Sequence, residues 1–209
     1  MIKVCLADNS PVVHFGIKSY FKDNAEIVIA SNVGNYNLLK EVLNTKEIDV
    51  LIVDLDLNGL TSINDLKAFV KEYPNTKILI FSNYSEKMYA PNAIKIGISG
   101  YLHKSEKLET LGQSIIRVSK GEIILTDEIK KSIALISKQN KGERSFRKIS
   151  TREIEVLRHL IDGKKNKEVA AALNLNEKTI STYKLRLLTK LNVTNVVDLV
   201  NKAKTLEII

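Results

Sequence analysis

The first 120 residues alternate between short apolar runs and segments in which apolar residues recur every three or four positions. The apolar runs predict strands, which we place at Ile2–Ala7, Glu26–Ser31, Asp49–Asp54, Lys77–Ser82 and Gly100–Leu102. The periodic segments between them predict helices, with apolar faces around Val13, Leu39, Leu66 and Ile115. Five such strand–helix units indicate an α/β domain, a doubly wound five-stranded parallel sheet of the flavodoxin-like type with right-handed crossovers.

The fourth helix of this series is weakly marked. Pro91 suits the first position of a helix, because its missing N–H would have no partner there, and Gly97 follows six residues later. These two residues predict a short helix beginning at about Pro91.

A central segment leaves this alternation. Thr126 is a suitable N-cap for a helix that runs to about Ser137. From Lys138 to Lys148 the residues are mainly Lys, Arg, Gln, Asn, Ser and Gly, which predicts a linker. The chain is therefore divided into a first domain at residues 1–122, a helix and linker at 123–148, and a second domain at 149–209.

Every periodic segment after the linker is helical, which predicts an all-α domain of four helices. Ser150 and Glu153 match a capping box at the start of the first helix, which Gly163 ends. The other predicted features are a second helix at Asn166–Leu173, a left-handed turn at Asn174, a third helix capped by Asn176 that runs to about Lys190, and a last helix capped by Asn195.

The composition is that of a protein that builds packed cores. With 209 residues, 44% hydrophobic and 27% charged, the chain has room for two ordinary domains. No apolar run reaches the roughly 18 residues of a membrane span, and the N-terminus turns acidic too early for a signal peptide. Cys5 is the only cysteine, which excludes an internal disulfide, and its apolar surroundings predict a buried thiol. These features predict a cytoplasmic protein with no membrane partner.

The net charge of +8 is unevenly distributed. Residues 1–125 contain 14 Lys+Arg and 14 Asp+Glu, whereas residues 126–209 contain 18 and 10. All the excess positive charge therefore lies in the second half, as expected when only that half binds a polyanion.

Asp54 ends the central apolar run, and Asn58 and Gly59 supply the turn that follows it. Ligands of an open parallel sheet bind outside the carboxyl ends of its strands, so this carboxylate is expected at the floor of a crevice. Three roles are open to it: a metal ligand, a nucleophile that takes a phosphoryl group, or a simple cap of the turn.

Polar residues also follow the other strands. Asp8 and Asn9 follow the first strand, Ser82 ends the fourth and Lys104 follows the fifth. They supply an acid, an amide oxygen, a hydroxyl and a cation, the groups that position and neutralise a transferred phosphoryl group. Mg²⁺ prefers such hard oxygen ligands. Its expected ligands are Asp54, Asn9 and the backbone carbonyl of Asp56, with Asp8 acting through water.

Three segments resemble the receiver domain of bacterial two-component response regulators. They are Leu6-Ala-Asp-Asn-Ser-Pro11, Asp49–Gly59 and Ile98-Ser-Gly-Tyr-Leu-His-Lys104, which are similar to the family patterns L-x-A-D-D-H-P, D-V-x-x-x-D-L-x-M-P-G and A-x-G-Y-L-x-K. The resemblance implies that Asp54 is the phospho-acceptor, that a sensor histidine kinase is a partner, and that Ser82 and Tyr101 form a switch pair. In that family the hydroxyl turns toward the phosphoryl group and the aromatic ring moves inward behind it.

Three residues depart from the family pattern. Asn9 stands where the family has a second acid that binds the metal directly, Asn58 replaces a proline, and Asp56 adds a carboxylate beside the phospho-acceptor. A neutral amide oxygen binds Mg²⁺ more weakly than a carboxylate does. We therefore expect a weakened metal site.

The second and third helices of the basic half predict a helix-turn-helix. The third helix carries on its outward side Lys178, Ser181, Thr182, Lys184, Leu185 and Arg186. Cations of this kind bind phosphates, and short hydroxyl side chains approach base edges in the major groove. The same residues would also suit a helix face that only contacts solvent.

Four segments resemble the LuxR-type helix-turn-helix: Ile149-Ser-Thr-Arg-Glu-Ile-Glu-Val-Leu157, Asn166-Lys-Glu-Val-Ala170, Lys178-Thr-Ile-Ser-Thr182 and Lys190-Leu-Asn-Val193. The order of the two resemblances is that of the NarL/FixJ subfamily of response regulators. It implies a transcription regulator that binds double-stranded DNA and forms a homodimer through its last helix. The implied DNA-binding residues are Lys178, Thr179, Ser181, Thr182, Lys184, Arg186 and Lys190.

Two other functions remain open. The aspartates and the lysine of the pocket also resemble those of haloacid-dehalogenase-type phosphatases. That family, however, has Thr or Val where Asn58 stands and a later acidic pair that this chain matches poorly, so we expect no enzyme. Alternatively, the receiver acts only as a protein-interaction module that does not depend on phosphorylation.

Overall fold

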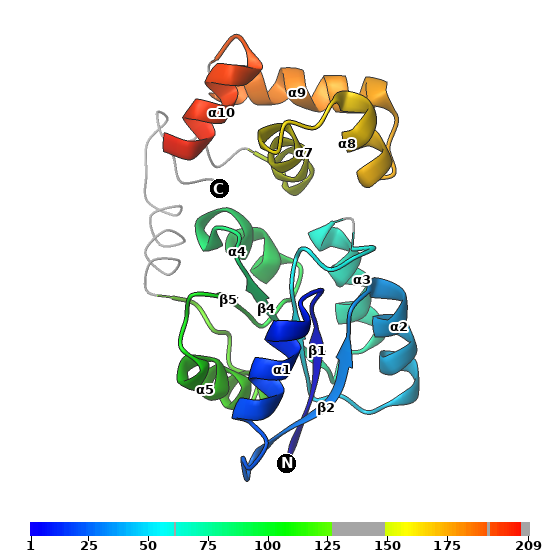
Figure 1. Ribbon diagram of the computed structural model, residues 1–209, viewed down its shortest axis with the longest axis vertical. Helices are drawn as coiled ribbons and strands as arrows, with labels where there is room; N and C mark the ends of the chain where they lie inside the picture. The colour runs from blue at the N-terminus through cyan, green and yellow to red at the C-terminus, as the bar shows by residue number, and fades with distance from the viewer. Residues whose placement is uncertain (61, 127–148, 192, 206–209) are drawn as a thin grey trace.

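The computed structural model describes residues 1–60, 62–126, 149–191 and 193–205 (Figure 1). Within these residues the N-terminal domain contains one sheet of five parallel strands in the order β2-β1-β3-β4-β5. The strands are β1 (Ile2–Ala7), β2 (Ile27–Val33), β3 (Val50–Val53), β4 (Lys77–Ser82) and β5 (Gly100–His103). The predicted doubly wound parallel sheet is therefore confirmed.

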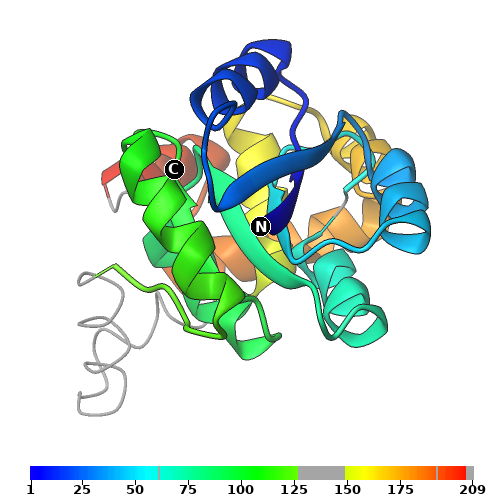
Figure 2. The same cartoon turned by 90° about the horizontal axis from the view of Figure 1, so that it is seen from below.

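The central strand β3 is buried along its whole length, and its side chains alternate between two apolar layers. Val50 and Ile52 face the layer formed with α1 (Pro11–Tyr20) and α5 (Leu108–Ser119). Leu51 and Val53 face the other layer, which contains α2 (Tyr36–Thr45), α3 (Ile63–Glu72) and α4 (Glu86–Lys95). Figure 2 shows α2 and α3 together on one side of the strands. Because helices cover both faces, a ligand reaches this sheet at the carboxyl ends of its strands.

The prediction of a short fourth helix beginning at about Pro91 is wrong. Helix α4 has 10 residues, and Pro91 lies inside it. Proline has no N–H to donate to the carbonyl four residues earlier, so the helix loses one hydrogen bond there. Tyr89, Ala90 and Ala93 are buried on the side that packs against the sheet. This packing outweighs the local cost of the proline.

The N-terminal domain continues past Glu122, the predicted boundary. Ile124 forms a parallel bridge with Gly100 and is buried in the layer under α1 and α5. Gly100 makes room for it, because a Cβ at this position would lie only 2.9 Å from the Cβ of Ile124. The helix predicted to start after Thr126 and the linker predicted after it lie outside the described residues.

The described part of the C-terminal domain contains four helices: α7 (Thr151–Ile161), α8 (Asn166–Ala172), α9 (Glu177–Leu191) and α10 (Val196–Thr205). The predicted capping box of Ser150 and Glu153 is present. Asn176 and Asn195 accept hydrogen bonds from the backbone N–H groups of Thr179 and Asp198, as caps do. Gly163 and Asn174 take left-handed conformations, with φ of 76° and 52°. None of the helices in the described ranges is long and apolar enough to cross a membrane.

Helix α7 is the part of the C-terminal domain that faces the N-terminal domain (Figure 1). Its apolar side, with Ile154 and Leu157, belongs to the core of the C-terminal domain. Its polar side faces the N-terminal domain, where a carboxylate oxygen of Glu155 accepts a hydrogen bond from the backbone N–H of Ile63 at 3.2 Å. Both sides of α7 are thus buried, the apolar side in the core of its own domain and the polar side against the N-terminal domain.

His159, also on α7, is 6% exposed, and its Nδ1 accepts a hydrogen bond from the Lys164 ammonium group at 3.0 Å. Burial, together with the positive charges of Lys164 and Arg158, lowers the pKa of His159 from 6.5 to about 4. The folded chain therefore holds this imidazole neutral in a pH range in which the unfolded chain protonates it.

We predict that the stability contributed by a neutral His159 is fully present above about pH 6.5 and is lost as the pH falls toward about 4. At about 1.4 kcal/mol for each pKa unit, the loss is at most about 3–4 kcal/mol. Urea unfolding of the wild type and of His159→Gln, followed by circular dichroism from about pH 7 to about pH 4.5, measures it. The wild type should lose more stability than the variant as the pH falls. A difference that stays constant over this range would contradict a buried neutral imidazole.

Candidate functional site

The carboxylate of Asp54 lies at the carboxyl end of β3 and is 6% exposed. Its Oδ1 accepts hydrogen bonds from the Ser82 hydroxyl at 2.6 Å and from the backbone N–H of Asp56 at 3.2 Å. Its Oδ2 accepts one from the Lys104 ammonium group at 2.6 Å. The groups predicted to meet at the ends of β3, β4 and β5 are therefore in direct contact.

Lys104 also binds a second buried carboxylate. Its Nζ lies 2.6 Å from Oδ2 of Asp8, which is 2% exposed and follows β1. The other Asp8 oxygen accepts a hydrogen bond from the backbone N–H of Ser10 at 2.7 Å. Burial opposes the charge of Lys104, but the hydrogen bonds and charges of Asp54 and Asp8 outweigh burial and raise its pKa. One lysine thus forms ion pairs with two acids at the same edge of the sheet.

Asn9 connects two loops at this edge. Its side-chain N–H donates a hydrogen bond to the backbone carbonyl of Asp56, and its Oδ1 accepts one from the backbone N–H of Asn58 at 2.8 Å. Both ends of the Asn9 amide therefore bind the loop that follows β3.

The donor atoms suit a magnesium ion in part. Asp8, Asp54 and the carbonyl of Asp56 are hard oxygen donors of the kind that Mg²⁺ takes together with waters. Within the described ranges, however, no three His, Cys, Asp or Glu side chains come together as a metal cluster. The Asn9 amide directs an N–H at the Asp56 carbonyl, where a carboxylate could not. Asp8 and Asp54 are thus the residues that would hold a cation, and Asn9 adds no charge to attract it.

The predicted switch residue Tyr101 is fully buried. Its hydroxyl donates a hydrogen bond to the backbone carbonyl of Tyr84 at 2.9 Å. The Tyr84 hydroxyl in turn donates to Oδ1 of Asp56 at 2.7 Å. Ser82 already contacts Asp54, so the hydroxyl and the ring of the predicted pair both point inward.

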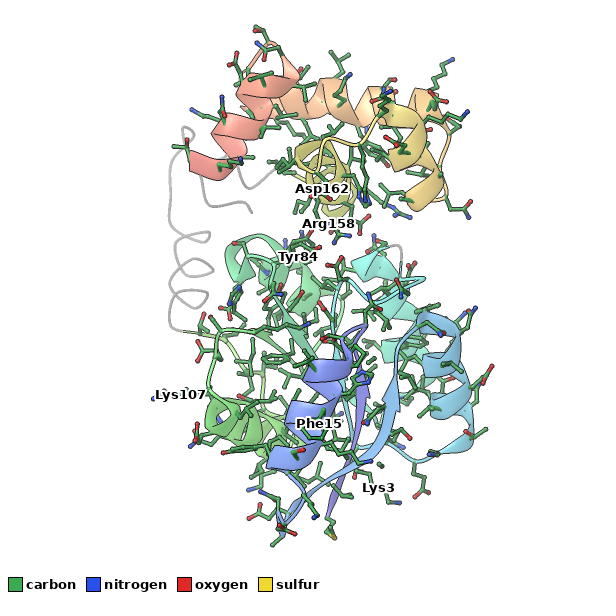
Figure 3. All side chains as sticks on the ribbon, in the orientation of Figure 1. Lys3, Phe15, Tyr84, Lys107, Arg158 and Asp162 are labelled. Carbon is green, nitrogen blue, oxygen red and sulfur yellow. The ribbon has the colours of Figure 1, made fainter. Side chains whose placement is uncertain are left out.

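Arg158 of α7, in the other domain, also contacts Tyr84 and Asp56. Its Nη2 lies 3.4 Å from Oδ1 of Asp56, and its guanidinium carbon lies 4.5 Å from the centroid of the Tyr84 ring. Figure 3 shows Arg158 and Tyr84 pointing toward each other across the domain boundary. Sequence analysis missed both residues, because neither belongs to a motif. The only sign of this contact in the sequence was a polar residue at every turn of α7.

Glu155, one turn before Arg158, is a second missed contact. Besides the N–H of Ile63, it binds the Arg152 guanidinium at 2.9 Å. It thereby supplies a negative charge to the N-terminus of α3, where a carboxylate is stabilising. Burial raises the pKa of Glu155 despite these partners. The domain interface is therefore built from hydrogen bonds and ion pairs of α7.

The outward face of α9 is open while the two domains are in contact. Its exposed residues include Lys178, Ser181, Thr182, Leu185 and Arg186, whereas Thr179 and Lys184 are half-buried. Leu185 is 65% exposed, which leaves it free to contact a base methyl group. Figure 1 shows α7 between α9 and the N-terminal domain.

Two hydroxyl groups on this face are held by the helix itself. Ser181 and Thr182 donate to the carbonyls of Glu177 and Lys178, each at 3.0 Å. Ser181 also accepts a hydrogen bond from the side-chain amide of Asn166, at the start of α8, at 3.1 Å. Asn166 therefore orients Ser181, a role that sequence analysis did not assign.

Lys190, one of the predicted DNA-binding residues, forms an ion pair within the C-terminal domain. Its ammonium group lies 2.8 and 2.6 Å from the two carboxylate oxygens of Glu153, which is 2% exposed. Burial works against the charge of Glu153, but the bonds from Lys190 and Ser150 outweigh it and lower its pKa. Lys190 therefore joins α9 to the capping box of α7.

Comparison with known proteins agrees with both parts of this arrangement. Residues 4–116, more than half of the chain, match the family model described as response regulator receiver domain. Residues 147–203 match bacterial regulatory proteins of the luxR family. The chain belongs to the response regulators with a LuxR-type DNA-binding domain. It is accordingly a DNA-binding transcription regulator, whose receiver carries the Asp54 pocket.

Similar response regulators span nearly the same length. The nitrate/nitrite response regulator protein homolog of Haemophilus influenzae is 34% identical over 194 residues, which is 92% of this chain and 91% of that protein. The fimbriae Z protein of Salmonella typhimurium is 30% identical over 206 residues, or 99% and 98% of the two chains. Among solved structures, RcsB of Salmonella enterica serovar Typhimurium, bound to the promoter P1flhDC in the presence of phosphomimetic BeF3⁻, matches with a TM-score of 0.78. That match has 25% identity and covers 98% of each chain.

We predict that Asn9→Asp strengthens Mg²⁺ binding to this receiver by about tenfold. The variant replaces an N–H that occupies the Asp56 carbonyl with a charged oxygen, and affinity for a hard cation rises with the number of charged ligands. Calorimetric titration measures the affinity. Asn58→Asp adds the same charge at an exposed position of the adjoining loop and serves as the control. Equal affinities of Asn9→Asp and the wild type would show that the amide does not limit metal binding.

Proposed function

We propose that this response regulator accepts a phosphoryl group on Asp54 and that phosphorylation controls its dimerisation and its binding to promoters. The observation that carries this proposal is the contact of Asp54 with both Ser82 and Lys104 at 2.6 Å. The hydroxyl would donate to a phosphoryl oxygen and the ammonium group would neutralise its charge, the two functions that phosphoryl transfer requires.

A sensor histidine kinase is the proposed donor. An Asp54 carboxylate oxygen would form a bond to phosphorus as the bond between phosphorus and the kinase histidine breaks. Mg²⁺, held by Asp8 and Asp54, would supply charge neutralisation when bound. This chain's own contribution is to keep Lys104 charged and within reach of both carboxylates.

DNA binding is proposed to use α9 in the major groove and α10 as the dimer contact. The open face of α9 supports the first part, because Lys178, Ser181 and Leu185 are exposed with the domains packed together. On α10, Val197 is 69% exposed and supports a contact with a second copy. The similar protein RcsB has been solved bound to a promoter, which supports promoter binding as the function.

One observation favours a second candidate, a regulator that acts without phosphorylation. Asn9 joins the loops of the pocket with two hydrogen bonds that need no cation, and Tyr101 is already buried. A receiver held in this form would present the same surface to its partners at all times. The two candidates differ in whether changing Asp54 alters DNA binding.

We predict that Asp54→Asn abolishes labelling by a small acyl phosphate in the presence of Mg²⁺, because the variant lacks the nucleophilic carboxylate. Mass spectrometry of the intact protein measures the label. Asp56→Asn removes a neighbouring carboxylate that is more exposed, and it should still be labelled. Labelling of the Asp54→Asn variant would show that another residue accepts the phosphoryl group. An unlabelled wild type, with DNA binding unchanged by Asp54→Asn, would favour the second candidate.

For DNA, we predict different effects of two changes on α9. Lys184→Ala should weaken binding to all duplexes alike and reduce the salt dependence by about one phosphate contact. Ser181→Ala should cost about 1–3 kcal/mol at particular base pairs and relax specificity there. Binding is titrated at several salt concentrations on a duplex selected from a random library and on its scrambled form, with Lys67→Ala, an exposed lysine of α3, as the control. Equal losses on both duplexes for Ser181→Ala would mean that Ser181 does not read bases.

A further inference from the structure

We infer that Arg158, a residue of the DNA-binding domain, is a positioning residue for phosphorylation of the receiver. Through Asp56 and Tyr84 it holds the loop that carries the backbone of the pocket, and it neutralises a carboxylate beside Asp54. The rate at which Asp54 accepts a phosphoryl group thus depends on a side chain of the other domain. This inference rests on the proposed role of Asp54.

The contacts of Asp56 lead from the pocket to the domain boundary. Its backbone N–H donates to Asp54, and its carbonyl accepts from the Asn9 amide, so its main chain belongs to the pocket. Its carboxylate points the other way and meets the Tyr84 hydroxyl at 2.7 Å and Arg158 at 3.4 Å. One residue therefore links the phospho-acceptor to α7.

Arg158 is held in place by more than its charge. It lies over the Tyr84 ring, and its side chain is only 16% exposed. Tyr84 is itself held in place, because its backbone carbonyl accepts a hydrogen bond from the hydroxyl of the buried Tyr101. The planar guanidinium stacks on an aromatic face and pairs with a carboxylate at the same time, which a lysine does less well.

The surface around Arg158 is closely packed. A cavity of about 10 Å³ remains between the domains, with walls that include Leu55 and Ile63 of the receiver and Glu155 and Arg158 of α7. That volume is about the space for one water molecule. Arg158 and the loop that follows β3 therefore border the same small space.

The charge of Asp56 gives Arg158 an effect on the reaction. A phosphodonor brings negative charge to a pocket in which Asn9 already replaces an acid, and the Asp56 carboxylate repels that charge. Arg158 and the Tyr84 hydroxyl offset this repulsion. The pair is partly exposed to solvent, since the Asp56 side chain is 56% exposed, so the effect is modest.

The test measures the rate of phosphorylation of the full chain by acetyl phosphate with Mg²⁺; the Asp54 oxygen bonds to phosphorus and acetate leaves. Arg158→Ala should slow labelling by about three- to tenfold. Arg158→Lys keeps the charge and should recover part of the rate. Lys167→Ala, an exposed lysine of α8, loses the same charge away from the interface and should react like the wild type.

Asp56→Asn separates a specific effect from a structural one. If Arg158 acts through the Asp56 carboxylate, Arg158→Ala should change the rate less than about twofold in the Asp56→Asn background. An equal slowing in both backgrounds, or none in the wild-type background, overturns the inference while leaving Asp54 as the acceptor. A wild type that takes no label overturns the proposed function and this inference together.

Discussion

The structure depends on how two buried carboxylates share one cation. Asp8 and Asp54 end neighbouring parallel strands, so they meet at the same edge of the sheet, where both are almost fully buried. Two negative charges taken from water so close together would be strongly unfavourable without a partner. Lys104 binds both at 2.6 Å and offsets part of that cost. The end of β5 is thereby held against the ends of β1 and β3, and Ser82 is positioned between them.

Asn9 stands where the family has an acidic residue. Asp56 supplies a carboxylate nearby, but that carboxylate has a different role. Asn9 joins the loops of the pocket through its amide, whereas Asp56 carries a carboxylate that points out of the pocket. That carboxylate is one of the points at which the DNA-binding domain contacts the receiver, through Arg158. The negative charge of Asp56 therefore lies at the contact between the two domains. The loop that follows β3 therefore takes part both in the pocket and in the contact between the domains.

Contact through α7 leaves the other helices of the DNA-binding domain available. The interface uses polar residues on one side of α7, including Glu155 and Arg158, while the apolar side anchors α8 and α9. Lys178 and Ser181 on α9 are exposed with the domains in contact. A receiver attached in this way does not cover the residues expected to reach DNA. Its influence on DNA binding would act through dimerisation or through the orientation of the domain.

Signals within the sequence were enough to predict the elements and most of the pocket. Apolar periodicity, caps such as Ser150, and the rule that parallel strands present their carboxyl ends together brought Asp54 and Lys104 to one site, because each of these signals is local or follows from topology. Three other features were settled only when the chain packed in three dimensions. Packing kept Pro91 inside α4, Glu153 paired with Lys190 of another helix, and Arg158 met Asp56 across a domain boundary. These outcomes depend on partners far away in the chain, and no pattern of neighbouring residues encodes such a partner.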